Sequence, residues 1–353
     1  QDGACARMAA RVLWSPSARH GARPFDRNER CGGLWSASPR LHLWSLLTVR
    51  SHALLGFFLD HYARHGVLLQ TNAHVVLHED FAPTTALVAA QKALSLRGVS
   101  HDVIPSVDAR LLEQIKIARL NRAIRKLPEN ALVIFADGDE FFTFPCDILD
   151  RLDRATRQGR SPRRGLATCC FMQDRVAANY ASSGFPSVSD VGPALDEQFP
   201  LCTRLRGMDI RRSPIYGNPM KLTLIRARAA GRVAAFASAH RVVYRLPSDN
   251  VSFSHSWKAG GFPGSKNNCL FDRSRFSHFS MTREAVGLAQ RKQNDHESSR
   301  TYNETWQLVR PCAREHRGAG AASSQGCLAF TRTGIFHLER QRTNCTPMCT
   351  ACH

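Results

Sequence analysis

The stretch that decides the fold reads Ala131-Leu-Val-Ile-Phe-Ala136 and continues directly into Asp137-Gly138-Asp139-Glu140-Phe141-Phe142. Six consecutive apolar residues before an acidic turn are typical of a strand that is buried on both faces of a sheet. In an open α/β sheet, the residues that follow such a strand lie at the edge where ligands bind. Asp137 and Asp139 can turn both carboxylates toward one hard cation, which commonly also takes phosphate oxygens of a substrate. We therefore predict a site for Mn²⁺ or Mg²⁺ and a diphosphate, with Asp137 and Asp139 as metal ligands.

A second interpretation of the same residues is structural. Acidic residues after a strand often form only a solvated turn, because Asp and Gly tolerate unusual backbone angles. The acidic motif alone does not separate these two interpretations, so the surrounding sequence has to decide.

Helices and strands alternate on both sides of this motif. Apolar residues at helical spacing predict helices over residues 54–65, 84–96, 109–126 and 147–154, and β-prone runs predict strands over 67–69, 75–77, 99–104, 165–172, 221–226 and 240–246. A segment rich in Ser, Pro and Gly over 181–198 predicts a long loop above the site. The alternation predicts an α/β fold with a mainly parallel central sheet flanked by helices.

The two ends of the chain lack this periodicity. Residues 1 to about 50 alternate Arg, Ser, Pro, Gly and Trp and predict a poorly ordered leader, with folded character beginning near His52. From residue 317 to residue 353 we predict an irregular tail that contains cysteines. Between these two ends, we predict a single catalytic domain over residues 51–316.

The charge balance favours an anionic partner. The 353 residues include 48 Lys and Arg against 29 Asp and Glu, a net charge of +19, which suits a nucleotide, a nucleic acid or a phospholipid surface. No aromatic residues interleave the arginine clusters at 160–164 and 204–212, as a single-strand-binding surface would require, so no nucleic-acid partner is expected. No apolar run reaches the roughly 20 residues of a membrane span, and membrane anchoring would need a segment outside this sequence.

Cysteines and sequons bear on the compartment. The tail motif Cys345-x3-Cys349-x2-Cys352-His353 has zinc-like spacing but no second ligand pair, which favours unpaired or disulfide-bonded cysteines. Three sequons, at Asn250, Asn303 and Asn344, are compatible with a secretory compartment such as the Golgi lumen.

Several segments resemble the family-two-like glycosyltransferases. The resemblance covers residues 52–316 and rests on Phe57-Phe-Leu-Asp-His-Tyr-Ala-Arg-His-Gly-Val67, on Leu120-Asn121 through Leu127-Pro128, and on Val133 to Phe141, which is similar to their Asp-x-Asp-Glu-Phe signature. Further matching segments follow in the expected order: Asp174-Arg-Val-Ala177, Gln198-Phe-Pro200, Lys221-Leu-Thr-Leu224, Ala239-His240 and His278-Phe279. The chain departs from the family at Gly138, where a larger apolar residue is more common, and at Ser280-Met281, where a Trp often follows His-Phe.

The resemblance implies a GT-A type fold and transfer of a sugar from a nucleotide-sugar donor. The sequence identifies neither the acceptor nor the stereochemical outcome, for which inversion is the favoured expectation. Of the two acidic residues, Asp139 lies nearer the loop and is the favoured direct ligand of Mn²⁺ or Mg²⁺, while Asp137 acts through water or on the ribose. His240 and His278 are candidates for a further metal ligand or a diphosphate contact, although a histidine after a strand is often only half-buried and hydrogen-bonded.

The remaining candidates concern the substrates. Inversion needs a carboxylate that takes the acceptor's proton, for which we select Asp174, whose alternative role is an ion pair with Arg175. Glu140 is a second catalytic candidate, as a base or as a residue that orients the site. Four further candidates share a substrate-binding role: Arg175 and Lys221 at the diphosphate, Asp80 at the nucleotide base, and Trp257 stacked on a sugar or packed in the core.

Two other functions fit parts of the sequence. A nucleotidyltransferase or another phosphoryl-handling enzyme also uses paired Asp residues to hold metal ions. A noncatalytic anion-binding protein would account for the net charge alone.

Overall fold

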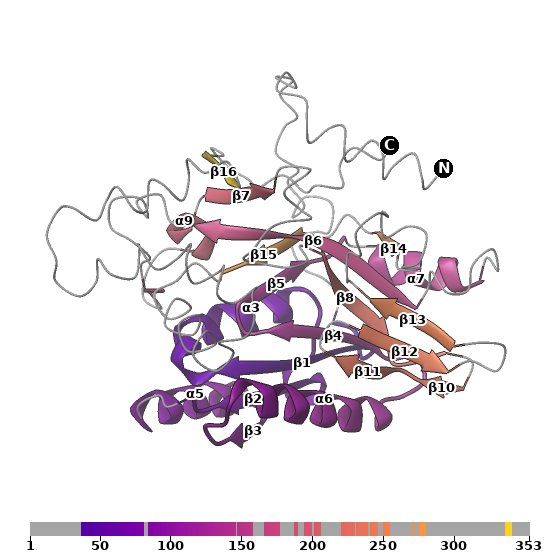
Figure 1. Cartoon of the computed structure of the whole chain (residues 1–353), viewed down its shortest axis with the longest axis horizontal. Helices are drawn as coiled ribbons and strands as arrows, with labels where there is room; N and C mark the ends of the chain where they lie inside the picture. The colour runs from indigo at the N-terminus through magenta and orange to yellow at the C-terminus, as the bar shows by residue number, and fades with distance from the viewer. Residues whose placement is uncertain are drawn as a thin grey trace, which may run out of the picture.

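The computed structural model describes residues 37–80, 84–145, 147–157, 166–176, 187–189, 194–199, 201–205, 220–229, 231–238, 241–245, 250–254, 270–271, 275–279 and 336–340. It shows a mixed α/β fold in which helices flank a large sheet whose core strands are parallel (Figure 1). The fold class predicted from the sequence is confirmed.

The strands of the described residues are β1 Leu41–Thr48, β2 Ala73–His78, β3 Ser100–Ile104, β4 Leu132–Asp137, β5 Glu140–Thr143, β6 Ala167–Val176, β7 Leu201–Leu205, β8 Met220–Arg226, β9 Arg228–Ala229, β10 Arg232–Val233, β11 Ala235–Ser238, β12 Arg241–Arg245, β13 Asn250–Ser254, β14 Leu270–Phe271, β15 Arg275–His278 and β16 Phe336–Arg340. The helices are η1 Val49–Leu54, α3 Leu55–Arg64, α4 Leu69–Asn72, α5 Thr84–Leu96, α6 Ala109–Arg125, α7 Ile148–Arg157 and α9 Leu195–Gln198.

The order of strands in the large sheet is β16-β7-β6-β8-β4-β1-β2-β3 (Figure 1). β1 pairs in parallel with β2 on one edge and with β4 on the other, and β3 pairs in parallel with β2. The chain therefore runs outward from β1 to β2 and β3, and then returns to place β4 on the opposite side of β1. This reversal makes the gap between the carboxyl ends of β1 and β4 a topological switch point, where open α/β sheets bind ligands.

Each face of the sheet carries its own hydrophobic core. Side chains alternate along β4, so that Ile134 and Ala136 pack on the face covered by α3, α5 and α7, whereas Val133 and Phe135 pack on the face covered by α6 and the β11–β13 sheet. β1 alternates in the same way and is buried along most of its length. With both faces covered, these strands carry near-continuous apolar sequence.

Two expectations about the chain ends are corrected. Residues 41–48, placed in a poorly ordered leader, form β1 at the centre of the sheet, because a strand buried on both faces need not show the alternation that the leader lacked. Residues 336–340, placed in an irregular tail, form β16, which pairs antiparallel with β7. Residues 1–36 and the cysteine-containing end of the tail lie outside the described residues.

Most inner elements lie where the sequence predicts them, with local exceptions. The run at 67–69 is no strand: Val67 makes a single bridge to Ser38, and α4 begins at Leu69. Within the predicted long loop, residues 195–198 form α9. In the helix predicted over 109–126, the apolar residue Leu111 is 41% exposed. No helix in the described part of the chain is both long enough and apolar enough to cross a membrane.

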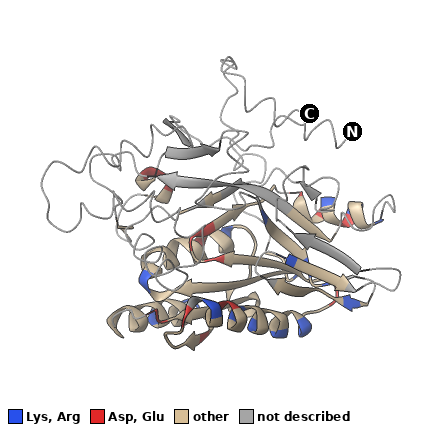
Figure 2. Cartoon of the chain, in the orientation of Figure 1, with Lys and Arg blue, Asp and Glu red and all other residues tan. Residues whose placement is uncertain are grey.

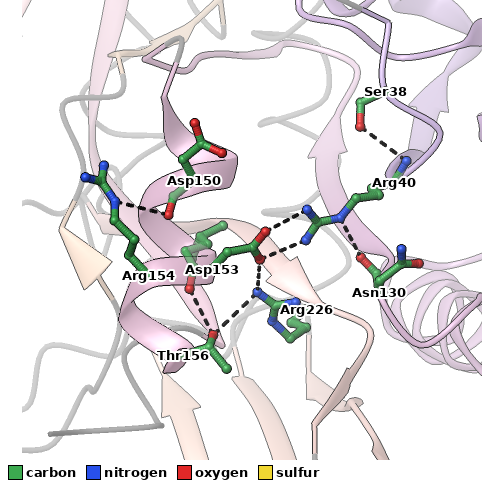
Figure 3. A network of polar contacts seen from close by, with 9 residues as sticks. Ser38, Arg40, Asn130, Asp150, Asp153, Arg154, Thr156 and Arg226 are labelled. Carbon is green, nitrogen blue, oxygen red and sulfur yellow. Dashed lines mark hydrogen bonds and ion pairs between the residues drawn. The ribbon is translucent and has the colours of Figure 1, made fainter. Parts of the chain in front are cut away.

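Asp153 on α7 accepts hydrogen bonds from Arg40, in the segment before β1, and from Arg226 of β8 (Figure 3). Both nitrogens of the Arg40 guanidinium fork donate to its carboxylate at 2.8 and 2.9 Å, and Arg226 Nη2 donates at 2.9 Å. Arg40 Nε also donates to the Asn130 carbonyl at 3.3 Å, just before β4. The hydrogen bonds from Arg40, followed by those from Arg226, outweigh partial burial and lower the pKa of Asp153 to about 2.

Replacing Asp153 with Asn should lower the free energy of unfolding at neutral pH by about 1 kcal/mol, a value discounted because the side chain is 30% exposed. Because the folded-state pKa lies below the ordinary value of about 3.9, this contribution is present above pH 4 and is lost as the pH falls toward 2. Urea unfolding from pH 7 to pH 2.5 should therefore show the gap between wild type and Asp153→Asn closing below pH 4. An exposed control, Asp60→Asn, should show a small gap throughout; a gap for Asp153→Asn that keeps its neutral-pH size at pH 2.5 would contradict the assignment.

Candidate active site and metal centre

The acidic turn lies at the switch point of the sheet. Asp137 is the last residue of β4 and pairs in register with Leu46 of β1, so Asp137, Gly138 and Asp139 follow the carboxyl end of a strand held on both edges. The side chains of Asp137 and Asp139 are half-buried at this edge. Figure 2 shows acidic residues where β4 passes into β5. The structure thus places the turn at the edge that the sequence predicted for it.

Gly138 allows the turn to lie against β1. A Cβ atom built at this position would come within 2.6 Å of Leu47 Cδ1 and 2.8 Å of Leu47 Cγ. Leu47 is fully buried and has little room to move. Glycine is therefore required here by a close approach to a neighbouring side chain.

The last turn of α3 supports the strand that follows the acidic turn. The Tyr62 hydroxyl donates to the Glu140 carbonyl at 2.9 Å and accepts from the Phe142 amide at 3.1 Å. Burial raises the pKa of Tyr62 well above its usual value, so the hydroxyl keeps the proton that it donates. Beside it, His61 Nε2 contacts the Phe142 carbonyl at 3.0 Å, and burial lowers the pKa of His61, so the neutral ring donates this bond. Two segments that carry the family resemblance, around His61-Tyr62 and around Glu140-Phe141, are thus in direct contact.

On the opposite face, two lysines meet the carboxylates of the turn. Lys116 Nζ of α6 lies 2.7 Å from Asp137 Oδ1, and Lys221 Nζ of β8 lies 3.7 Å from Asp137 Oδ2. Lys221 also forms a short ion pair with the Glu140 carboxylate, which in turn accepts from the Asp137 amide at 2.8 Å. We call Lys116, Asp137, Glu140 and Lys221 the carboxylate–lysine cluster.

The cluster is largely removed from water. The side chains of Lys116, Lys221 and Glu140 are 9%, 8% and 7% exposed, whereas that of Asp137 is 35% exposed. Burial alone would lower the pKa of Lys221, but the charges of Glu140, Asp137 and Asp139 outweigh it and raise the pKa. Both ammonium groups also lie over the Phe135 ring, at 4.9 and 5.5 Å from its centroid. Lys221 is therefore charged, and its burial favours a role in holding carboxylates over direct contact with a diphosphate.

Strand β15 brings further predicted residues to the same region. β15 lies between β5 and β6, and His278 pairs in register with Glu140 on one side and with Asp174 on the other. Phe279, the next residue, donates its amide to the Asp139 carbonyl at 2.9 Å and packs edge-on against Phe141. The backbones at Glu140, Asp174 and His278 thus share one level of the sheet.

Asp80 lies farther along the same edge, after β2. It is buried with a positive φ of 48°, and its carbonyl accepts from Arg50 Nε at 3.0 Å, in the segment that follows β1. β2 lies two strands from β4 in the sheet, a separation of about 10 Å.

The structure leaves some predicted residues undescribed and adds one that the sequence analysis missed. His240 and Trp257 lie outside the described residues, and of Asp174, Arg175 and His278 only the backbone is described, with Arg175 paired to Cys202. Lys116 was missed. Its signal was available, since Lys116, Leu120 and Ile124 recur every four residues and are the buried positions of α6, so the lysine interrupts an otherwise apolar stripe.

The turn fits a dication that arrives with a phosphate-bearing ligand. Among the described residues, no group of three or more His, Cys, Asp or Glu side chains is arranged to hold a metal ion. Mg²⁺ and Mn²⁺ sites of nucleotide-using enzymes commonly take only one or two carboxylates and complete their shell with phosphates and water. The half-exposed carboxylate of Asp139 suits such a site, whereas both oxygens of Asp137 face ammonium groups.

Comparison with known proteins gives little further support. No protein-family model matches the chain, and a search of curated proteins gives no match. Among solved structures, the chain is similar to a mannosyltransferase, PcManGT from Pyrobaculum calidifontis in complex with GDP-Man and Mn²⁺, with 12% sequence identity over 94% of this chain and 85% of that chain, at a TM-score of 0.31. A similarity this low supports no inference about the function of this chain.

Gly138→Ala should lower the free energy of unfolding by about 1 to 2 kcal/mol, because the new methyl group overlaps the buried Leu47 side chain. Combining it with Leu47→Val should cost less than the sum of the two single changes, by about 1 kcal/mol, as measured by urea unfolding. Gly56→Ala is the matched control, since a Cβ there would meet only Arg97 Nη2 at 3.8 Å, and it should be neutral or stabilising. Strict additivity of the two changes would show that the predicted overlap does not occur.

Tyr62→Phe should lower the free energy of unfolding by about 1 to 3 kcal/mol and speed hydrogen exchange of the Phe142 amide, since it removes the hydroxyl that bridges Glu140 and Phe142. Tyr244→Phe is the control: this buried hydroxyl donates to the Arg226 carbonyl. It should destabilise the protein comparably in an unfolding experiment. Before global unfolding, exchange at Phe142 should change only in Tyr62→Phe, and equal effects of the two variants would contradict a local role.

Proposed function

We propose that this chain is a metal-dependent glycosyltransferase, which moves a sugar from a nucleotide-sugar donor to an acceptor with Mn²⁺ or Mg²⁺ as the cofactor. The observation that carries the proposal is the position of Asp137-Gly138-Asp139 at the switch point between β1 and β4. The solvated-turn interpretation is less favoured, because charged side chains from α6 and β8 are buried against this turn. The family resemblance of the same residues supports the proposal from the sequence.

The donor would lie along the edge formed by the ends of β4, β1 and β2. Asp139 is the proposed ligand of the dication, which when bound neutralises negative charge on the departing nucleoside diphosphate. Asp80, about two strand spacings away, is the proposed contact for the nucleoside. Arg50, in the segment that follows β1, lies between them in the strand order. Its hydrogen bond to the Asp80 carbonyl holds the residue after β2 in place.

The acceptor would enter from the side of β5, β15 and β6. An inverting transfer needs a base that takes the acceptor's hydroxyl proton as the new bond forms. Asp174 is the proposed base, because the register of β15 places its backbone level with Glu140 and therefore close to the acidic turn. Glu140 itself is buried in an ion pair with Lys221, which favours a role in orienting the turn over a role as base. His278 lies between the two strands as a candidate second ligand or diphosphate contact.

The purified chain, incubated with a panel of UDP- and GDP-sugars and Mn²⁺, should release nucleoside diphosphate, and chelation of the metal should stop the release. Asp139→Asn should lower the rate by a factor of about 100 or more, because it removes the carboxylate that holds the charge-neutralising cation. Asp60→Asn, in an exposed ion pair with Arg97, is the control and should retain full activity.

Three outcomes would count against this proposal. Unchanged turnover and Mn²⁺ dependence in Asp139→Asn would remove the catalytic assignment. Release of pyrophosphate instead of nucleoside diphosphate would identify a nucleotidyltransferase. Nucleotide binding that needs no divalent ion and merely fades with added salt would favour a noncatalytic basic protein.

A further inference from the structure

The positive charge of the chain is unevenly distributed along its sequence. Acidic and basic residues are equal in number over 37–113, and acidic residues outnumber basic ones over 131–157. Residues 114–128 and 220–245, by contrast, contain several Lys and Arg and no Asp or Glu. These two stretches form the later part of α6 with the residues that follow it, and the strands from β8 to β12. Much of the excess charge therefore comes from two stretches that lie far apart in the sequence.

Side-chain contacts bring these two stretches together. The Asn121 amide of α6 donates to the Phe236 carbonyl of β11 at 2.9 Å and accepts from the Phe236 backbone amide at 2.8 Å. Arg228 of β9 donates to the carbonyls of Arg125 and Leu127, at 2.8 and 3.2 Å. The β9–β10 hairpin is therefore fixed beside the end of α6. Figure 2 shows Lys and Arg along α6 and on the strands beside its end.

We call Arg122, Arg125, Lys126 and Arg232 the basic patch. Arg122 precedes Arg125 and Lys126 by three and four residues, which places these side chains on one side of the last turn of the helix. Arg232 lies on β10 of the adjacent hairpin. All members of the patch are exposed. Glu129, a little farther along the chain, offsets a single charge.

Stabilisation of the helix end explains only part of this patch. Cations near the last carbonyls of a helix interact favourably with its dipole, which is a sufficient reason for one or two of them. The carbonyls of Arg125 and Leu127 already accept hydrogen bonds from Arg228. Arg232 lies on a different element and is not at a helix end. Exposed cations on neighbouring elements also repel one another, so the patch favours a partner that supplies negative charge.

The chemistry of the patch favours a fluid anionic surface over a nucleic acid. The large apolar side chains exposed in the described part of the chain are Leu68, Val88, Leu96 and Leu111, and none of these lies in the last turn of α6 or on the hairpin. The described residues therefore offer no aromatic ring at the patch on which bases could stack. Lipid headgroups move laterally and can gather beneath cations that the fold holds in place. Clusters of about four or more Lys and Arg on a helix are typical of surfaces that bind phosphatidylserine.

We propose that the basic patch docks the protein on the surface of an anionic phospholipid bilayer. The attraction is electrostatic, because no described side chain at the patch is an exposed apolar group that would enter the acyl region. Each Lys or Arg near such a surface strengthens binding by about fivefold. Docking concerns a second surface of the molecule and does not depend on the proposed transferase activity.

The patch lies at the opposite end of the sheet from the acidic turn. α6 ends at Arg125, shortly before β4 begins at Leu132, whereas the acidic turn starts at Asp137 at the other end of β4. A strand of this length separates its two ends by about 20 Å. A bilayer at the patch and a nucleotide at the acidic turn would therefore contact different residues and could be bound together.

Co-sedimentation of the purified chain with lipid vesicles tests this inference. At about 0.1 M salt, the chain should bind vesicles that contain about 30% phosphatidylserine and should not bind vesicles of phosphatidylcholine alone. Raising the salt to about 0.5 M should release it, because the attraction is screened. Arg122→Gln/Arg125→Gln/Lys126→Gln should weaken binding by about 100-fold, since it removes three cations. Arg232→Gln should weaken binding about fivefold, and it serves alone if the triple variant does not fold.

Arg64→Gln/Lys92→Gln/Arg157→Gln is the matched control. It removes the same net charge from exposed positions on α3, α5 and α7, which cover the other face of the sheet, and it should bind vesicles like wild type. Equal losses in the two triple variants would show that only net charge matters and would overturn the proposal. Wild type that does not bind phosphatidylserine vesicles would also overturn it. An oligonucleotide complex that depends on the patch, without vesicle binding, would assign the patch to a nucleic acid instead.

Discussion

Strand β4 is paired on both edges and covered on both faces, and this burial determines where the acidic turn that follows it lies. β1 holds one edge in parallel register and β8 holds the other in antiparallel register. Because side chains alternate along a strand, the burial of Phe135 on the α6 face determines that Asp137, two residues later, emerges on that same face. The position of the first carboxylate is therefore a consequence of core packing and not of loop conformation.

The turn after β4 is held from both faces by contacts of different kinds. On the α3 face the contacts are neutral: Leu47 against Gly138, and the Tyr62 hydroxyl between Glu140 and Phe142. On the α6 face they are ionic, from Lys116 and Lys221 to Asp137 and Glu140. Such a turn keeps its shape without a bound cation, because the repulsion among its carboxylates is already offset by the two ammonium groups. A site organised before its ligand arrives loses less free energy to reorganisation when the ligand binds.

The sequence predicted the elements whose pattern reports one property at a time. β4 is an apolar run that ends directly in the acidic turn. The helix predicted over residues 84–96 has the same bounds as α5. β1 was not predicted because its sequence, LHLWSLLT, includes His, Ser and Trp in a strand with no exposed face. Neither an alternating pattern nor an uninterrupted apolar run therefore identified it. Lys116 was missed for a related reason: a lysine is read as exposed, and only its partner Asp137, 21 residues away in the sequence, makes its burial favourable.

Gly138 departs from the signature that the surrounding residues resemble, and its contacts explain why a glycine stands here. Larger apolar residues are more common at this position in the glycosyltransferases that the chain resembles. Here Leu47 of β1 packs against the turn, and its Cδ1 atom lies within 2.6 Å of where a Cβ at residue 138 would be. Leu47 therefore fills the contact between β1 and the turn and leaves no room for a side chain at residue 138. Asp137 and Asp139 lie on either side of that contact, so the packing of Leu47 against Gly138 helps to fix the backbone from which both side chains extend.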